Sequence, residues 1–169
     1  MSEFVIRTLS IDDLPRVLEL NEANVPEVGP LDPDRLRFLV DDAEIALVVV
    51  DDDGGVVGFC IVFGPGSSYD SVNYVWFMAH HPGSLYLDRV ALDESVRGRG
   101  LGTRLYAEVD RIMRSTRPDA DGLTLEVNLD PPNEPSLRFH SKLGFEEVGR
   151  QMSKGIEVSL MRRPIDATA

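Results

Sequence analysis

Hydrophobic positions along the chain follow two spacings, one typical of strands and one typical of helices. Apolar and β-branched runs predict strands over residues 3–9, 45–50, 56–63, 84–92 and 123–129, with a strand hairpin over 147–161. Apolar residues at helical spacing, with their flanking start and stop signals, predict helices over 10–23, 34–40, 100–117 and 135–143. This order of elements predicts a mixed α/β fold with helices on both faces of one sheet.

The turns between these elements are marked by familiar residue types. Ser10 and Asp13 resemble a helix-capping box, residues 51–55 form an acidic, glycine-ending hairpin turn, and Lys154-Gly155 turns the last hairpin. Residues 64–83 are predicted to be a long irregular connection. Connections of that length are uncommon, and long ones rich in aromatic residues are often functional.

Composition and charge narrow the possible functions. The chain has 169 residues, no linker and no membrane-length apolar run, so we expect one domain over 3–163 and no membrane partner. One cysteine and no signal-peptide pattern favour a cytoplasmic protein. A net charge of −12 argues against nucleic acid. Residues 84–117 nevertheless carry seven arginines against five acids, which favours a small anionic ligand.

The strongest chemical signal is a glycine-rich loop between a strand and a helix. Its sequence is Arg97-Gly98-Arg99-Gly100-Leu101-Gly102-Thr103. Unpaired N–H groups at a helix N-terminus suit a phosphate, and glycines let the backbone approach it closely. The two arginines can add charge-assisted hydrogen bonds, so the segment is interpreted as a pyrophosphate-binding loop.

Two other phosphate-binding motifs fit less well. A P-loop requires Lys after the last glycine, where this chain has Thr103. A dinucleotide fingerprint has the spacing G-x-G-x-x-G in the first βαβ unit, whereas this loop comes late in the chain. Glu126 lies near the distance expected for a ribose-binding acid, so a Rossmann-type nucleotide-binding oxidoreductase stays an alternative.

Two blocks of sequence resemble the GNAT N-acetyltransferase superfamily. The first is Arg97-x-x-Gly100-x-Gly102 after a strand that ends at Leu92. The second is Asn133-x-x-Ser136-x-x-Phe139-His140-x-x-x-Gly144-Phe145. The resemblance implies a mostly antiparallel central sheet in which strands 85–92 and 123–129 splay apart.

The resemblance also implies an acyl-CoA site. Pantetheine would bind the backbone near Val90 and Leu92, and the pyrophosphate would bind loop 97–103. The thioester end would lie beside Asn133 and the helix after it, which carries Ser136 and Phe139. Acetyl-CoA is therefore the expected co-substrate, and no metal is expected.

Acyl transfer to an amine needs a proton donor for the thiolate, and often a base for the amine. The family usually has Tyr after the Phe of the second block, where this chain has His140. We therefore expect His140 to donate the proton to the thiolate. Tyr86 and Tyr106 are alternative donors. Asp88 and Glu126 are candidate bases, unless each is a salt-bridge partner or ordered water takes the proton. Strand alternation places Tyr86, Asp88 and Val90 on one face.

Acceptor-binding residues are expected in the loop after the first helix and in 64–83. The candidates are Asn24, Tyr69, Asp70, Asn73, Tyr74 and Trp76. His80 and His81 are adjacent and point apart on an extended chain, so we interpret them as a polar turn and not as a metal site.

The sequence thus predicts acetyl transfer from acetyl-CoA to a small, cationic amine such as an amino acid derivative, a polyamine or an aminoglycoside. The acidic surface favours such a cation. A non-catalytic acyl-CoA-binding module is the alternative that the His140 substitution keeps open. A homodimer is expected because similar proteins often form one.

Overall fold

The central sheet has seven strands, in the order β1-β2-β3-β4-β5-β7-β6. In this computed structural model, which describes residues 3–165, the strands are β1 (Val5–Thr8), β2 (Ile45–Val50), β3 (Val56–Phe63), β4 (Ser84–Leu92), β5 (Gly122–Asn128), β6 (Glu146–Ser153) and β7 (Ile156–Pro164). Among the strands of residues 3–165, β4 and β5 pair in parallel, and the other neighbouring pairs are antiparallel. The expected mostly antiparallel sheet is confirmed.

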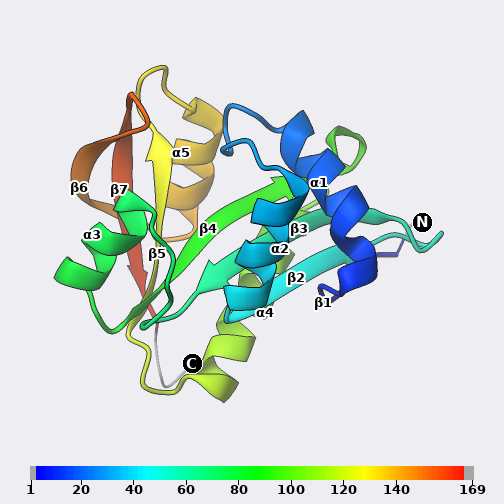
Figure 1. Ribbon diagram of the computed structural model, residues 1–169, viewed down its shortest axis with the longest axis horizontal. Coiled ribbons are helices and arrows are strands. Elements are labelled where there is room, and N and C mark those ends of the chain that lie inside the picture. The colour runs from blue at the N-terminus through cyan, green and yellow to red at the C-terminus, as the bar shows by residue number, and fades with distance from the viewer. Residues whose placement is uncertain (1–2, 166–169) are drawn as a thin grey trace.

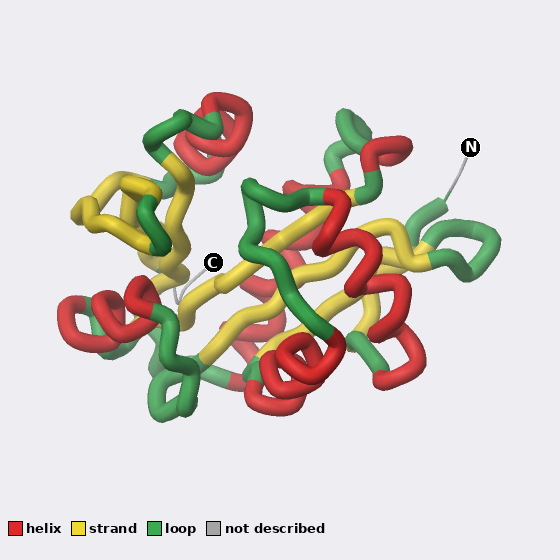
Figure 2. Tube along the Cα trace, turned by 45° about the horizontal axis from the view of Figure 1, so that its top comes forward, coloured by secondary structure: helices red, strands yellow, loops and turns green. Residues whose placement is uncertain are grey.

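Helices cover both faces of this sheet, as the sequence predicts (Figure 1, Figure 2). One face packs against α1 (Leu14–Ala23), α2 (Pro33–Asp42) and α3 (Val72–His80), and the other against α4 (Leu101–Thr116) and α5 (Glu134–Lys142). Leu101, Leu105, Val109 and Met113 are buried on one side of α4, which is why its apolar spacing follows the helical period. Within residues 3–165, every helix is too short or too polar to span a bilayer.

The prediction that 64–83 is irregular is wrong for its second half, which forms α3. Ser71 caps this helix by accepting hydrogen bonds from the backbone N–H groups of Asn73 and Tyr74. Tyr74 and Phe77, three positions apart, are buried against the sheet. Aromatic and β-branched residues have modest helix propensity, so local pattern gives little sign of a helix that tertiary packing stabilises.

A β-bulge in β4 corrects the predicted strand alternation. The register with β3 shifts where Arg89 pairs with Ile61 and Leu87 pairs with Val62, so Asp88 is the extra residue. Asp88 and Arg89 then both lie on the α1 side of the sheet, where they bond Tyr69 and Asn21 respectively. Val90 instead packs with the α4 side, contrary to the prediction that it shares a face with Tyr86.

Strands β4 and β5 separate after a short paired region. Only Ser84–Tyr86 of β4 pair with Gly122–Thr124 of β5. Beyond that point β4 continues beside β3, and β5 continues beside β7. The divergence is visible in Figure 1 and confirms the expected splay. It leaves one backbone edge of Leu87–Leu92 without a strand partner in the described chain.

Candidate functional site

Two adjoining pockets occupy the space that opens between β4 and β5. The inner pocket, of about 100 Å³, lies toward α4 and α5 and is lined by Leu87, Val90, Tyr106, Asn133, Ser136 and His140. The outer pocket, of about 290 Å³, lies between the α1–α2 loop, Tyr69, Asn73 and the β6–β7 turn. Both pockets are lined by Glu27, Val28, Asp88, Arg89 and Glu126. Two strand carboxylates therefore stand where the pockets meet.

Asp88 is held by a buried ion pair that the bulge creates. Arg89 Nε donates to Asp88 Oδ2 at 2.7 Å, and the hydroxyl of Tyr69 donates to Asp88 Oδ1 at 2.6 Å. The Arg89 guanidinium also donates to Asn21 Oδ1 at 2.9 Å and to the Gly29 carbonyl at 3.0 Å. Arg89 thus connects β4 to α1 and to the loop that walls the outer pocket.

Glu126 is the carboxylate with the most altered acidity. The hydroxyl of Tyr86 donates to Glu126 Oε2 at 2.6 Å. Exclusion of water, together with the negative charge of Asp88, raises the pKa of Glu126 to about 8. A carboxylate with a pKa in this range can accept a proton near neutral pH and release it again. The sequence identified Glu126 as a candidate, and the structure adds the physical cause of its basicity.

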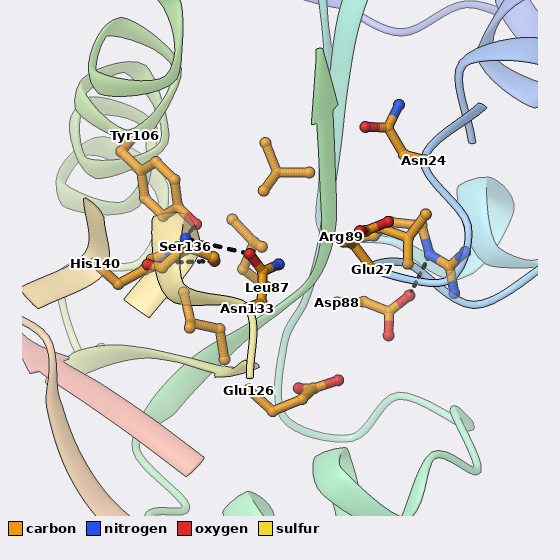
Figure 3. Close-up of a pocket in the computed structure, with 13 residues that line it drawn as sticks. Asn24, Glu27, Leu87, Asp88, Arg89, Tyr106, Glu126, Asn133, Ser136 and His140 are labelled. Carbon is orange, nitrogen blue, oxygen red and sulfur yellow. Dashed lines mark hydrogen bonds and ion pairs between the residues drawn. The ribbon is translucent and has the colours of Figure 1, made fainter. Parts of the chain in front are cut away.

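His140 and Tyr106 form a hydrogen-bonded pair on the opposite wall of the inner pocket (Figure 3). His140 Nε2 lies 2.6 Å from the hydroxyl of Tyr106, and His140 Nδ1 lies 2.8 Å from the Ser136 carbonyl. A carbonyl can only accept, so Nδ1 carries the proton and Nε2 of the neutral ring accepts from Tyr106. Burial lowers the pKa of His140 and raises that of Tyr106.

The glycine-rich loop leads from β4, through a short turn, to the N-terminus of α4. Gly98 has a φ of 79° and Gly100 a φ of 74°, a backbone conformation that residues with a side chain rarely adopt. Among residues 3–165, the backbone N–H groups of 98–103 have no hydrogen-bond acceptor. Free N–H groups at the N-terminus of a helix attract an anion. The loop therefore has the geometry of the anion site that its sequence predicts.

The other residues expected at the cofactor lie around this loop. Arg97 donates to Asn24 Oδ1 at 2.8 Å, and the Arg99 guanidinium lies 5.9 Å from the centre of the Phe4 ring. A Cβ at Gly102 would lie 3.1 Å from the Phe139 ring, so glycine lets α4 and α5 approach closely here. Asn133 accepts from the Ser136 N–H at the start of α5, Leu92 lies at the end of β4, and Thr103 is exposed.

The six expected acceptor residues are not all brought together. Asn24 lines the inner pocket, whereas Tyr69 and Asn73 line the outer one. The other three lie outside both pockets: Asp70 pairs with Arg35 at the surface, Tyr74 is buried and donates to the Gly64 carbonyl, and Trp76 stacks on His80. Formation of α3 explains the positions of Tyr74 and Trp76, because successive helical residues point in different directions.

Several pocket residues were not singled out from the sequence. Arg89 is the buried charged residue among these, and the nearby glycine-rich arginine segment gave no sign of its separate role. Glu27 and Lys154 also line the outer pocket, from a proline-rich loop and from a hairpin turn. Such positions carry no local pattern, because only the folded chain brings the loop and the turn together.

Comparisons with known proteins agree with this geometry. The model of the Acetyltransferase (GNAT) family matches residues 14–145. No curated protein matches the sequence. Among solved structures, the ribosomal-protein-S18-alanine N-acetyltransferase of Escherichia coli aligns over 97% of this chain and 95% of its own, with a TM-score of 0.71 and 17% identity.

Two further solved structures show the same fold. An N-acetyltransferase from Staphylococcus aureus Mu50 covers 97% of this chain and 99% of its own, with a TM-score of 0.73 and 17% identity. NAA60 of Arabidopsis thaliana in complex with acetyl-CoA covers 96% and 99%, also with a TM-score of 0.73 and 17% identity. At these identities the likeness establishes a shared chain fold.

Proposed function

Because the chain belongs to the GNAT acetyltransferase family, we propose that it transfers the acetyl group of acetyl-CoA to the amine of a small molecule. The loop carries this proposal: free N–H groups at 98–103 open the helix beside the splayed strands. The crystal structure of Arabidopsis thaliana NAA60 contains acetyl-CoA, which supports the choice of donor. Acetyl-CoA would supply a thioester acyl group and leave as the thiol.

The residues of the loop and of β4 fit the two polar parts of acetyl-CoA. The pyrophosphate would accept hydrogen bonds from the 98–103 backbone, with Arg97 and Arg99 adding positive charge. The unpaired edge of Leu87–Leu92 offers N–H and C=O groups to the amides of the pantetheine arm. The inner pocket, lined by Leu87, Val90, Asn133 and His140, would then hold the thioester end.

The two carboxylates at the junction of the pockets would receive the amine. Glu126 would take a proton from the amine nitrogen at its carboxylate oxygen, which its raised pKa favours. Asp88 is paired with Arg89 and Tyr69, and its charge helps to raise the pKa of Glu126. Asp88, and Glu126 when it is ionised, would attract a cationic amine to the junction, so we propose direct transfer with the amine and acetyl-CoA bound together.

The proton for the departing sulfur would come from the pair Tyr106 and His140. When His140 is protonated on both ring nitrogens, Nε2–H would donate to the Tyr106 oxygen while the Tyr106 O–H passes its proton to sulfur. Burial lowers the pKa of His140, so its imidazolium is a stronger acid than a thiol of pKa about 8.5. The Ser136 carbonyl holds the ring in place throughout.

The test is a thiol-release assay with acetyl-CoA and a panel of amines, with the acetylated products identified by mass spectrometry. Release that depends on the amine supports the proposal. Tight binding of acetyl-CoA with no release for any amine would instead favour a non-catalytic acyl-CoA-binding module. Preferential binding of NAD over acetyl-CoA in calorimetry would contradict the assignment of the loop.

A further inference from the structure

The outer pocket is lined by groups of opposite charge. Asp88 and Glu126 line both pockets, so they mark the place where the two pockets join. Lys154 lines only the outer pocket, on the turn between β6 and β7. A molecule that fills the outer pocket therefore meets two carboxylates where the pockets join and, elsewhere on the lining, the Lys154 ammonium.

The fold directs Lys154 toward the pocket wall. Lys154 and Gly155 have φ values of 51° and 80°, which is the tight hairpin turn that two positive φ angles produce. The Lys154 Nζ lies 3.5 Å from where a Cβ on Gly29 would stand. The ammonium group thus lies beside the α1–α2 loop, at the same Gly29 whose carbonyl accepts from Arg89.

Lys154 has no ion-pair partner within the described chain, although its positive charge helps, after Arg35, to lower the pKa of Asp70. Its ammonium forms no ion pair or hydrogen bond with any residue of 3–165, although the protein has a net charge of −12. The neighbouring basic residues on β7 behave differently: Arg162 pairs with Asp121 at 3.1 Å and Arg163 with Asp110 at 2.6 Å. The other cation of the pocket, Arg89, is already paired with Asp88.

The remaining polar groups of the outer pocket do not replace Lys154 as a site for an anion. Glu27 is an exposed acid that lines both pockets, so its charge adds to that of the carboxylates. The Ser71 hydroxyl caps α3, and the Ser153 hydroxyl accepts from Asn73. Lys154 is therefore the strongest unpaired donor that the pocket offers to a ligand.

Building on the proposed function, we infer that the acceptor is an amino acid, whose amine lies at Asp88 and Glu126 and whose carboxylate pairs with Lys154. The volume of about 290 Å³ is at the small end of ligand pockets, which suits a single amino acid. Polyamines and aminoglycosides carry several ammonium groups and no carboxylate, so one of their cations would meet Lys154. This orientation directs the reacting amine toward the inner pocket.

The decisive experiment compares amino acids with their own carboxamides. The proteinogenic L-amino acids, β-alanine and 4-aminobutyrate, each beside its carboxamide, are assayed with acetyl-CoA. Loss of a hydrogen bond to a charged group typically lowers affinity by about tenfold or more. We expect the best free acid to exceed its amide by at least this factor in kcat/KM, through a lower KM.

Substitutions at Lys154 test whether this residue causes the preference for the free acid over its carboxamide. Lys154→Met should reduce the acid-to-amide ratio to near one and leave the KM for acetyl-CoA unchanged. Lys154→Arg keeps the charge and should retain the preference. Lys142→Met is the matched control, since Lys142 is the other lysine of the chain and lies outside both pockets. It should behave like the wild type.

The binding step separates this inference from the proposed function. The same acids and amides are titrated by calorimetry into protein saturated with coenzyme A. If the protein binds the acids more tightly than their amides, and Lys154→Met abolishes this difference, the inference is supported. It is supported even if no amine is acetylated, because that second result contradicts only the proposed acetyl transfer. Turnover of amines with no preference for the acid, or a preference that Lys154→Met leaves intact, overturns the inference and leaves acetyl transfer standing.

Discussion

The hydroxyl of Tyr106 lies 2.6 Å from Nε2 of His140, and this contact joins α4 to α5 at the wall of the inner pocket. The sequence presents His140 as an isolated replacement for the tyrosine that similar proteins carry. In the folded chain the phenol is present as well, but it comes from a different helix. We therefore propose that the two residues act together as the proton donor.

This pairing predicts non-additive effects on the rate. Tyr106→Phe and His140→Gln should each lower kcat by ~10²–10⁴, the usual range for loss of acid catalysis. The double variant should be no slower than the worse single variant, because both act in one proton path. Acetyl-CoA affinity, measured by calorimetry, should stay unchanged. A folded Tyr106→Phe variant that turns over at the wild-type rate would exclude this pair as the proton donor to sulfur.

The positive φ of Gly100 predicts that the loop does not tolerate a β-branched residue. Gly100→Val should raise the Kd for acetyl-CoA by at least about tenfold, because the displaced backbone loses hydrogen bonds to the pyrophosphate. Gly54→Val is the matched control: Gly54 has a φ of 82° and equally open surroundings, but lies in the β2–β3 hairpin. Both variants should lose ~1–2 kcal/mol of stability from backbone strain, and only Gly100→Val should lose acetyl-CoA binding.

The raised pKa of Glu126 predicts a pH dependence with a definite sign. Glu126 accepts a proton only as the carboxylate, and the proton path to sulfur needs His140 protonated, although burial lowers the pKa of His140 below that of Glu126. The fraction of protein that meets both conditions is greatest between the two pKa values, so kcat/KM for the amine should fall with pH above the pKa of about 8. Glu126→Gln should remove this transition and lower kcat/KM by ~10²–10⁴. Any rise with pH should then follow the pKa of the amine itself, which differs from one acceptor to the next. An unchanged transition near pH 8 in Glu126→Gln would assign it to another group.

Two adjacent residues of the segment before α3 should differ in their effect on acceptor binding. Tyr69→Phe removes the hydroxyl that donates to Asp88 at the outer pocket and should raise the amine KM, by up to about tenfold. Asp70→Asn should leave the KM unchanged, because that side chain is 78% exposed and pairs with Arg35. Steady-state kinetics on both variants tests this, and a larger effect at Asp70 would move the acceptor site toward α2.

The buried ion pair of Arg89 and Asp88 should be important for stability. Arg89→Met leaves the Asp88 carboxylate without its cation in a site where the two side chains are only 6% and 4% exposed. Breaking such a pair typically costs ~3–5 kcal/mol. Arg37→Met breaks a surface pair whose side chains are 52% and 62% exposed, and should cost at most ~1 kcal/mol. Urea unfolding measures the loss of stability in each variant. Equal losses in Arg89→Met and Arg37→Met would show that other groups stabilise the Asp88 carboxylate when Arg89 is absent.

The sequence determined those features that depend on neighbours along the chain. Apolar spacing located β2, β3, β4 and α4 within a residue or so, because each element buries one face or a continuous run. The glycine-rich loop was recognisable for the same reason, since its proposed function depends on consecutive N–H groups and on glycine at particular backbone angles. Local chemistry is enough to specify such features.

Tertiary structure alone decided which side chains meet. The bulge at Asp88 turns Arg89 toward α1 and Val90 toward α4, although strand alternation predicts the opposite for Val90. Packing against the sheet makes 72–80 a helix, and so removes Tyr74 and Trp76 from the pocket. Lys154 comes beside Gly29 because distant segments pack together. Contacts of this kind depend on the three-dimensional course of the chain, which local periodicity does not encode.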